Sequence, residues 1–97
     1  MFSKIFGGNL YHLSMNGHTD GVQSVCISGN HIVSGSHDKT IKVWDINTGE
    51  NIHTFESHNN IVYSLYISKN GKWLFSGSKR ELFVWDFENY TNKPIKN

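Results

Sequence analysis

The 97-residue chain contains two similar segments at a spacing of about forty residues. His18 stands near the start of the first segment, and Trp44 near its end. His58 follows His18 by 40 residues, and Trp85 follows Trp44 by 41 residues. A fixed period of this length is typical of proteins that stack copies of one small structural unit. The two segments therefore predict two copies of one unit, arranged as a single region.

Each segment predicts short β-strands separated by turns, because runs of apolar and β-branched residues alternate with turn residues. Asn70 and Gly71 are a strong hairpin signal in the second segment. Alanine is absent from the chain, which argues against helices. We predict an all-β chain of two four-stranded antiparallel units. The expected strands span 22–28, 31–36, 41–45 and 51–55 in the first segment, and 62–68, 75–78 and 82–86 in the second.

The predicted boundaries divide the chain into four parts. Residues 8–15 form a leading strand that matches the fourth strand of a unit, and 16–55 form the first repeat. Residues 56–87 supply the first three strands of the second repeat, and 88–97 form a polar tail. The last fourth strand is expected to be weak or missing, because Pro94 interrupts a sheet ladder.

These landmarks resemble the WD repeat, the unit of WD-type β-propellers. Gly17 with His18, and Val43 with Trp44 and Asp45, carry the resemblance. It implies a hydrogen-bonded structural tetrad of His, Ser, Asp and Trp. The matching residues are His18, Ser34, Asp38 and Trp44 in the first repeat, and His58, Ser76 and Trp85 in the second.

The second repeat lacks the aspartate of this pattern. Glu81 is the nearby carboxylate that could replace it, but the turn is one residue shorter. The expectation is a looser second unit, in which His58→Ala costs less stability than His18→Ala.

Two units are too few for a closed propeller, which uses about four to eight blades. Three explanations stay open. The chain is a fragment of a larger propeller, or copies of it assemble so that residues 10–15 complete the open unit of the next copy. In the third explanation, a different chain supplies the missing blades.

The resemblance implies a non-catalytic scaffold for protein or peptide partners. The alternative is a substrate-targeting or regulatory segment of a larger enzyme, of the ubiquitin ligase or kinase type. The face that carries the loops is the expected partner surface, and tyrosine and arginine often dominate binding energy there. A histidine in such a surface makes binding sensitive to pH. The candidate residues are Gln23, His37, Ile61, Tyr63, Lys79 and Arg80.

Other functions are not expected from this sequence. The six histidines show no zinc-binding motif, and we predict no metal, cofactor or active site. Cys26 lies in an apolar run, which favours an inert core thiol. A net charge of +1 makes nucleic acid an unlikely partner. No apolar run spans a membrane and no secretory signal is visible, so the cytoplasm is the expected location.

Overall fold

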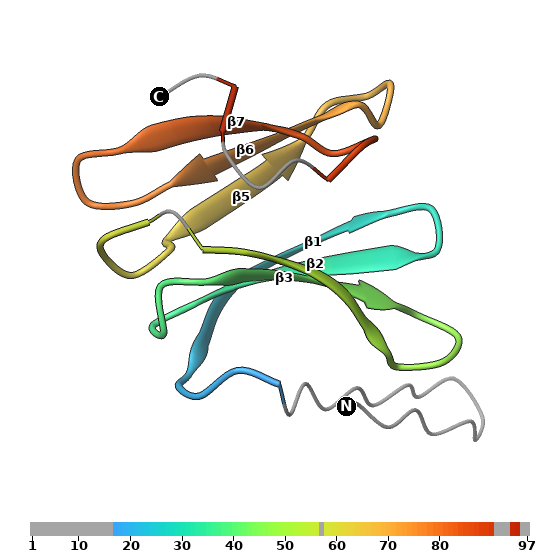
Figure 1. The fold of residues 1–97 in the computed structure, drawn as a ribbon, viewed down its shortest axis with the longest axis horizontal. Coiled ribbons are helices and arrows are strands. Elements are labelled where there is room, and N and C mark those ends of the chain that lie inside the picture. Colours follow the sequence, from blue (N-terminus) through green and yellow to red (C-terminus); the bar gives the residue numbers. More distant parts are fainter. Residues whose placement is uncertain (1–16, 57, 91–93, 96–97) are drawn as a thin grey trace.

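The computed structural model describes residues 17–56, 58–90, 94 and 95, and these form two antiparallel sheets (Figure 1). The leading strand expected at 8–15 lies outside the described residues. The first sheet has the order β1-β2-β3-β4 and the second β5-β6-β7. The strands are β1 (Val22–Ser28), β2 (His31–Ser36), β3 (Ile41–Asp45), β4 (Asn51–Phe55), β5 (Ser64–Ile67), β6 (Trp73–Gly77) and β7 (Leu82–Asp86).

The predicted all-β class is confirmed, with four strands in one sheet and three in the other. The two sheets lie one above the other, as Figure 1 shows. Strand alternation sends every second side chain toward the space between them. Cys26, Val33 and Val43 are cross-strand neighbours in the first sheet and belong to the shared core. Trp85 and Leu74, a cross-strand pair, fill it from the second sheet.

Val62 joins the two sheets at the point where the chain enters the second one. Its backbone N–H donates to the Ser36 carbonyl at 3.1 Å. Its side chain lies over Gly35, where an added Cβ would stand 2.6 Å from Val62 Cγ1. Because the Val62 N–H bonds the first sheet, β5 begins at Ser64 and is shorter than the predicted run 62–68.

The segment after β7 turns in the same way as the segment after β3. Gly49 donates its N–H to the Asp45 carbonyl with φ 76°, and Tyr90 donates to the Asp86 carbonyl with φ 52°. A positive φ is uncommon for a residue that carries a side chain. The Tyr90 ring stacks on His53 of the first sheet, with ring centroids 5.2 Å apart and planes 11° apart. This contact holds the turn against the neighbouring sheet.

Candidate functional site

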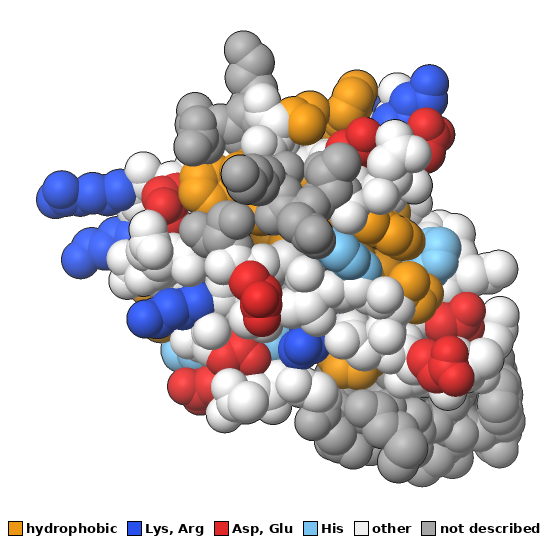
Figure 2. Space-filling view, in the orientation of Figure 1, with side chains coloured by type: hydrophobic (Ala, Val, Ile, Leu, Met, Phe, Trp, Pro, Cys, Tyr) orange, Lys and Arg blue, Asp and Glu red, His pale blue; other side chains and the backbone are white. Residues whose placement is uncertain are grey.

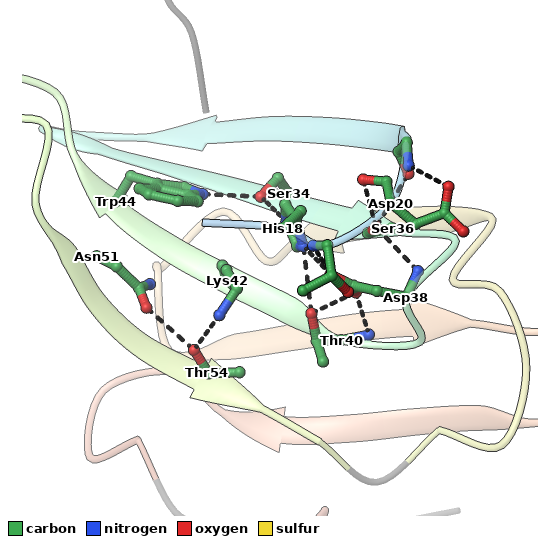
Figure 3. Close-up of polar contacts among 12 residues, drawn as sticks. His18, Asp20, Ser34, Ser36, Asp38, Thr40, Lys42, Trp44, Asn51 and Thr54 are labelled. Atoms are coloured by element: carbon green, nitrogen blue, oxygen red, sulfur yellow. Dashed lines mark hydrogen bonds and ion pairs between the residues drawn. The ribbon is translucent and has the colours of Figure 1, made fainter. Parts of the chain in front are cut away.

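A chain of hydrogen bonds runs through the interior of the first sheet (Figure 3). The indole N–H of Trp44 donates to Ser34 Oγ at 2.8 Å, and Ser34 Oγ lies 2.6 Å from His18 Nε2. His18 Nδ1 lies 2.9 Å from Asp38 Oδ2. The Asp38 carboxylate can only accept, so His18 Nδ1–H donates to it. With Nε2 as the acceptor of the ring, the Ser34 O–H donates to His18 Nε2 while Ser34 Oγ accepts from the indole. The chain connects the turn before β1 to strands β2 and β3.

Asp38 anchors this chain at the β2–β3 turn. Its carboxylate accepts the backbone N–H of Thr19 at 3.0 Å and that of Thr40 at 2.9 Å, and the Thr40 hydroxyl also donates to it. Burial raises the pKa of Asp38, but the hydrogen bonds from Thr40, His18 and Thr19 outweigh burial and hold the pKa well below its usual range. Sequence reasoning missed Thr40, although a threonine two residues after an aspartate is a turn signal.

Glu81 takes the place of the missing aspartate in the second sheet. Trp85 Nε1 donates to Ser76 Oγ at 2.7 Å, and Ser76 Oγ lies 2.6 Å from His58 Nε2. His58 Nδ1 lies 3.2 Å from Glu81 Oε1, and Glu81 also accepts the backbone N–H of Asn59 at 3.2 Å. The extra methylene of glutamate spans the shorter turn. The carboxylate is the looser part, because the Glu81 side chain is 25% exposed and that of Asp38 is 7% exposed.

The two carboxylates therefore predict unequal losses of stability. Asp38→Asn is expected to lower the free energy of unfolding by about 1–3 kcal/mol, because an amide offers one acceptor oxygen where the carboxylate offers two. Glu81→Gln is expected to cost less, because water reaches Glu81. Urea unfolding of both variants measures the difference. Equal losses would contradict it. Because both imidazole side chains are 1% exposed, the carboxylates give a sharper comparison than His18→Ala against His58→Ala.

His58 and His53 make stability depend on pH. Burial lowers the pKa of His58, and Glu81 opposes the shift. Burial also lowers the pKa of His53, whose Nε2 finds no hydrogen-bond partner among the described residues. A histidine pKa lowered by folding stabilises the fold above the ordinary value of about 6.5, and this contribution is lost as the pH falls through the folded-state pKa.

The melting temperature is therefore expected to fall on acidification from about pH 7.5 to about pH 5. His53→Phe keeps a ring against Tyr90 and removes one titrating group, so its melting temperature should fall less over the same range. Thermal unfolding at several pH values measures both slopes. Parallel curves for the two proteins would rule out a contribution from His53.

The candidate partner residues lie in segments at one end of the two sheets, on the left in Figure 1. His37 Nε2 and Gln23 Oε1 are in hydrogen-bond contact at 2.8 Å and are exposed. Tyr63, in the segment before β5, is 51% exposed. Ile61 is half-buried, and its carbonyl accepts from Ser78 Oγ. Lys79 and Arg80 are exposed in the β6–β7 turn. We call this end of the molecule the loop edge.

Sequence reasoning missed one cation at the loop edge. Lys39 is exposed in the β2–β3 turn and has φ 74°. Figure 2 shows Lys and Arg side chains projecting at this end. Lys39, Lys79 and Arg80 therefore give the loop edge cations from both sheets.

Chemical sites are not apparent in the described part of the chain. No group of three or more His, Cys, Asp or Glu side chains there could hold a metal ion. Burial raises the pKa of the Cys26 thiol to about 11, so the thiol stays protonated at neutral pH. In the same residues, no helix has the length and apolarity needed to cross a membrane.

Comparisons with known proteins give the chain its family. The model of the WD domain, G-beta repeat, matches residues 9–45 and 49–86. Cell division control protein 4 of Candida albicans is 42% identical over 83 residues, which cover 84% of this chain and 12% of that protein. Nuclear distribution protein PAC1 of Arthroderma otae is 42% identical over 61% of this chain and 13% of its own length. This chain thus spans a small part of each relative.

Two solved structures are also similar. The computationally designed Ika4 protein matches with a TM-score of 0.72 and 32% identity, over 84% of this chain and 49% of that one. The computationally designed Ika8 protein matches with the same TM-score and identity, over 84% of this chain and 25% of its own. Because the two family matches together cover most of the chain, this chain belongs to the WD domain, G-beta repeat family.

Proposed function

We propose that the chain is a non-catalytic scaffold that binds a protein or peptide at the loop edge. The hydrogen bond between the Val62 N–H and the Ser36 carbonyl is the observation that carries the proposal. It fixes the β2–β3 turn of one sheet beside the segment that precedes β5 of the other. His37 and Tyr63, which follow the two bonded residues, therefore flank one junction and present a surface drawn from both repeats.

The side chains at the loop edge suit protein recognition. Tyr63 offers a large, exposed ring, and Arg80 offers a planar cation with several donors. Both residue types are enriched among those that contribute most to binding energy. The tetrads lie directly behind these loops, and their buried bonds give the loops a fixed position. A preordered surface loses less conformational entropy on binding.

Capture of partners by the immobilised chain, followed by quantitative mass spectrometry, tests this proposal. Tyr63→Ala and Arg80→Ala are each expected to weaken recovery of a specific partner about tenfold, the effect of roughly 1.4 kcal/mol. Lys69→Ala is the control, because Lys69 is an exposed cation in the β5–β6 turn at the opposite end. Equal recovery by all three variants would remove the loop edge from the binding site.

A second candidate is a targeting segment of a larger enzyme, with its catalytic domain outside this chain. It is favoured by the small share of the relatives that the chain spans, 12% for Cell division control protein 4 and 13% for PAC1. A transcript that joins this segment to a catalytic domain would support it. We also propose the cytoplasm as the location, because Cys26 is a free thiol.

A further inference from the structure

The filled interface between the two sheets shows what each face of a repeat accepts. We call the face of each sheet that points toward the next repeat its downstream face, and the opposite face its upstream face. The downstream face of the first sheet carries Cys26, Val33, Gly35, Ile41 and Val43. The upstream face of the second sheet, with Val62, Leu65, Ile67, Leu74 and Trp85, covers it.

The downstream face of the second sheet repeats this apolar pattern but is uncovered. Tyr66, Phe75 and Val84 are cross-strand neighbours at the positions of Cys26, Val33 and Val43. Leu82 is 62% exposed, whereas Ile41, its equivalent in the first sheet, is fully buried at 0%. Exposed apolar surfaces of this kind mark interaction sites. This face therefore has the composition of a covered interface and no cover among the described residues.

The upstream face of the first sheet is exposed along β1 only, because Ile32 and Trp44, which continue this face on β2 and β3, are buried at 1% and 0%. Val22 is 42% exposed, whereas its equivalent Val62 is buried at 0%. Val25 and Ile27 are exposed, and Ile27 reaches 64%. Their equivalents Leu65 and Ile67 are partly buried against the shared core. The molecule therefore exposes the downstream face of the second sheet and, at the opposite end of the stack, the β1 part of the upstream face of the first sheet.

Gly35 lies in the filled interface, and Gly77 is its equivalent on the exposed downstream face of the second sheet. In the filled interface, Val62 lies over Gly35. A Cβ added to Gly35 would stand 2.6 Å from Val62 Cγ1 and 2.8 Å from Ser24 Oγ. Gly77 and Ser64 occupy the equivalent positions in the second sheet. Only Ser64 lies within 4 Å of an added Cβ on Gly77, so the place that Val62 fills over Gly35 is open.

We propose that the downstream face of the second sheet binds the upstream face of the first sheet in a second copy of this chain, with Val22 of that copy over Gly77. The contact continues the part of the filled interface in which Val62 lies over Gly35, with Gly77 as the matching small residue at its centre. It is head-to-tail, so each bound copy exposes a new free face. Propellers close with about four to eight blades, so a closed ring takes roughly two to four copies.

One difference separates the two interfaces. Lys42 stands in the first sheet where the second has Phe83, and its ammonium donates to Thr54 Oγ1 at 3.0 Å. The contact between copies is therefore more polar near the outer strands than the contact within the chain. It is expected to be the weaker of the two and to depend on concentration.

Two charge substitutions test the proposal, with mass measured by light scattering on a sizing column. The unaltered chain is expected to assemble into a discrete species of roughly two to four copies. Leu82→Glu and Ile27→Glu each place a carboxylate where the neighbour would bury it, so each variant should be monomeric. Each retains one intact face. An equimolar mixture of the two variants is therefore expected to form a dimer that grows no further.

Matched variants make the outcome decisive. Lys69→Glu is the control, because Lys69 is exposed in the β5–β6 turn, and it should assemble like the unaltered chain. Circular dichroism checks that each variant retains its sheets. If one does not, Tyr66→Glu and Val25→Glu repeat the experiment on the same two faces. A monomeric unaltered chain, assembly that survives either charge, or a mixture without dimers would each overturn the proposal.

Discussion

Ser76→Ala is expected to lower the free energy of unfolding by about 2–5 kcal/mol, because one hydroxyl serves two buried groups. Ser76 Oγ accepts from Trp85 Nε1 at 2.7 Å and donates to His58 Nε2, 2.6 Å away. All three residues are buried, so water cannot replace the lost bonds. Each unsatisfied buried group costs about 1–3 kcal/mol. A small domain has only about 5–15 kcal/mol in total, so this substitution should remove a large fraction of the stability.

Urea unfolding followed by tryptophan fluorescence measures this loss. Ser64→Ala is the matched control, because Ser64 is an exposed serine in the adjacent strand β5, and its replacement should change stability little. A loss for Ser76→Ala no larger than that for Ser64→Ala would show that the hydrogen-bond chain contributes little to the fold.

Gly35→Val is the second substitution with a large expected effect. An added Cβ at Gly35 would lie 2.6 Å from Val62 Cγ1 and 2.8 Å from Ser24 Oγ. A branched side chain would force the two sheets apart, because the Val62 backbone is bonded to Ser36 beside it. Overpacking of this kind costs about 1–3 kcal/mol, and the separation of the sheets also removes apolar contact.

Gly77→Val is the control at the equivalent position of the second sheet. Its added Cβ meets only Ser64 Oγ, which can rotate away. In dilute protein, Gly77→Val should therefore unfold at nearly the same urea concentration as the unaltered chain, while Gly35→Val unfolds earlier. At high concentration, Gly77→Val should also prevent assembly, since the valine would occupy the place proposed for Val22. Equal destabilisation by both substitutions in dilute protein would show that Val62 does not pack tightly over Gly35.

The strands were predictable because their signals are local. The expected runs 22–28, 31–36, 41–45 and 51–55 coincide with β1 to β4, since alternating apolar residues and turn residues define both ends of each. The prediction was less accurate where a tertiary contact determines the first residue of a strand. β5 begins two residues late, because the Val62 N–H bonds the other sheet, and no local pattern encodes that bond.

The hydrogen-bonded residues were predictable to a different degree in the two sheets. Both repeats preserve the spacing of His, Ser and Trp, and the structure brings each set within hydrogen-bond distance. Whether Glu81 reaches His58 depends on the path of a shortened turn, which spacing alone does not give. Tyr90 was hidden in a segment that looked polar. Its contact with His53 joins residues 37 positions apart and needs a positive φ that a tyrosine rarely adopts.

The alkylation rate of the Cys26 thiol depends on the separation of the two sheets. The chain has one cysteine, and its side chain packs against the shared core between the sheets. Alkylation requires both access and a thiolate, and burial suppresses each of them. Because Cys26 is half-buried, the rate at which an iodoacetamide reagent modifies the native protein combines reaction at the exposed part of the side chain with reaction while the sheets are apart. Compared with the rate in urea, it gives a lower bound on the free energy of that local opening without any introduced probe.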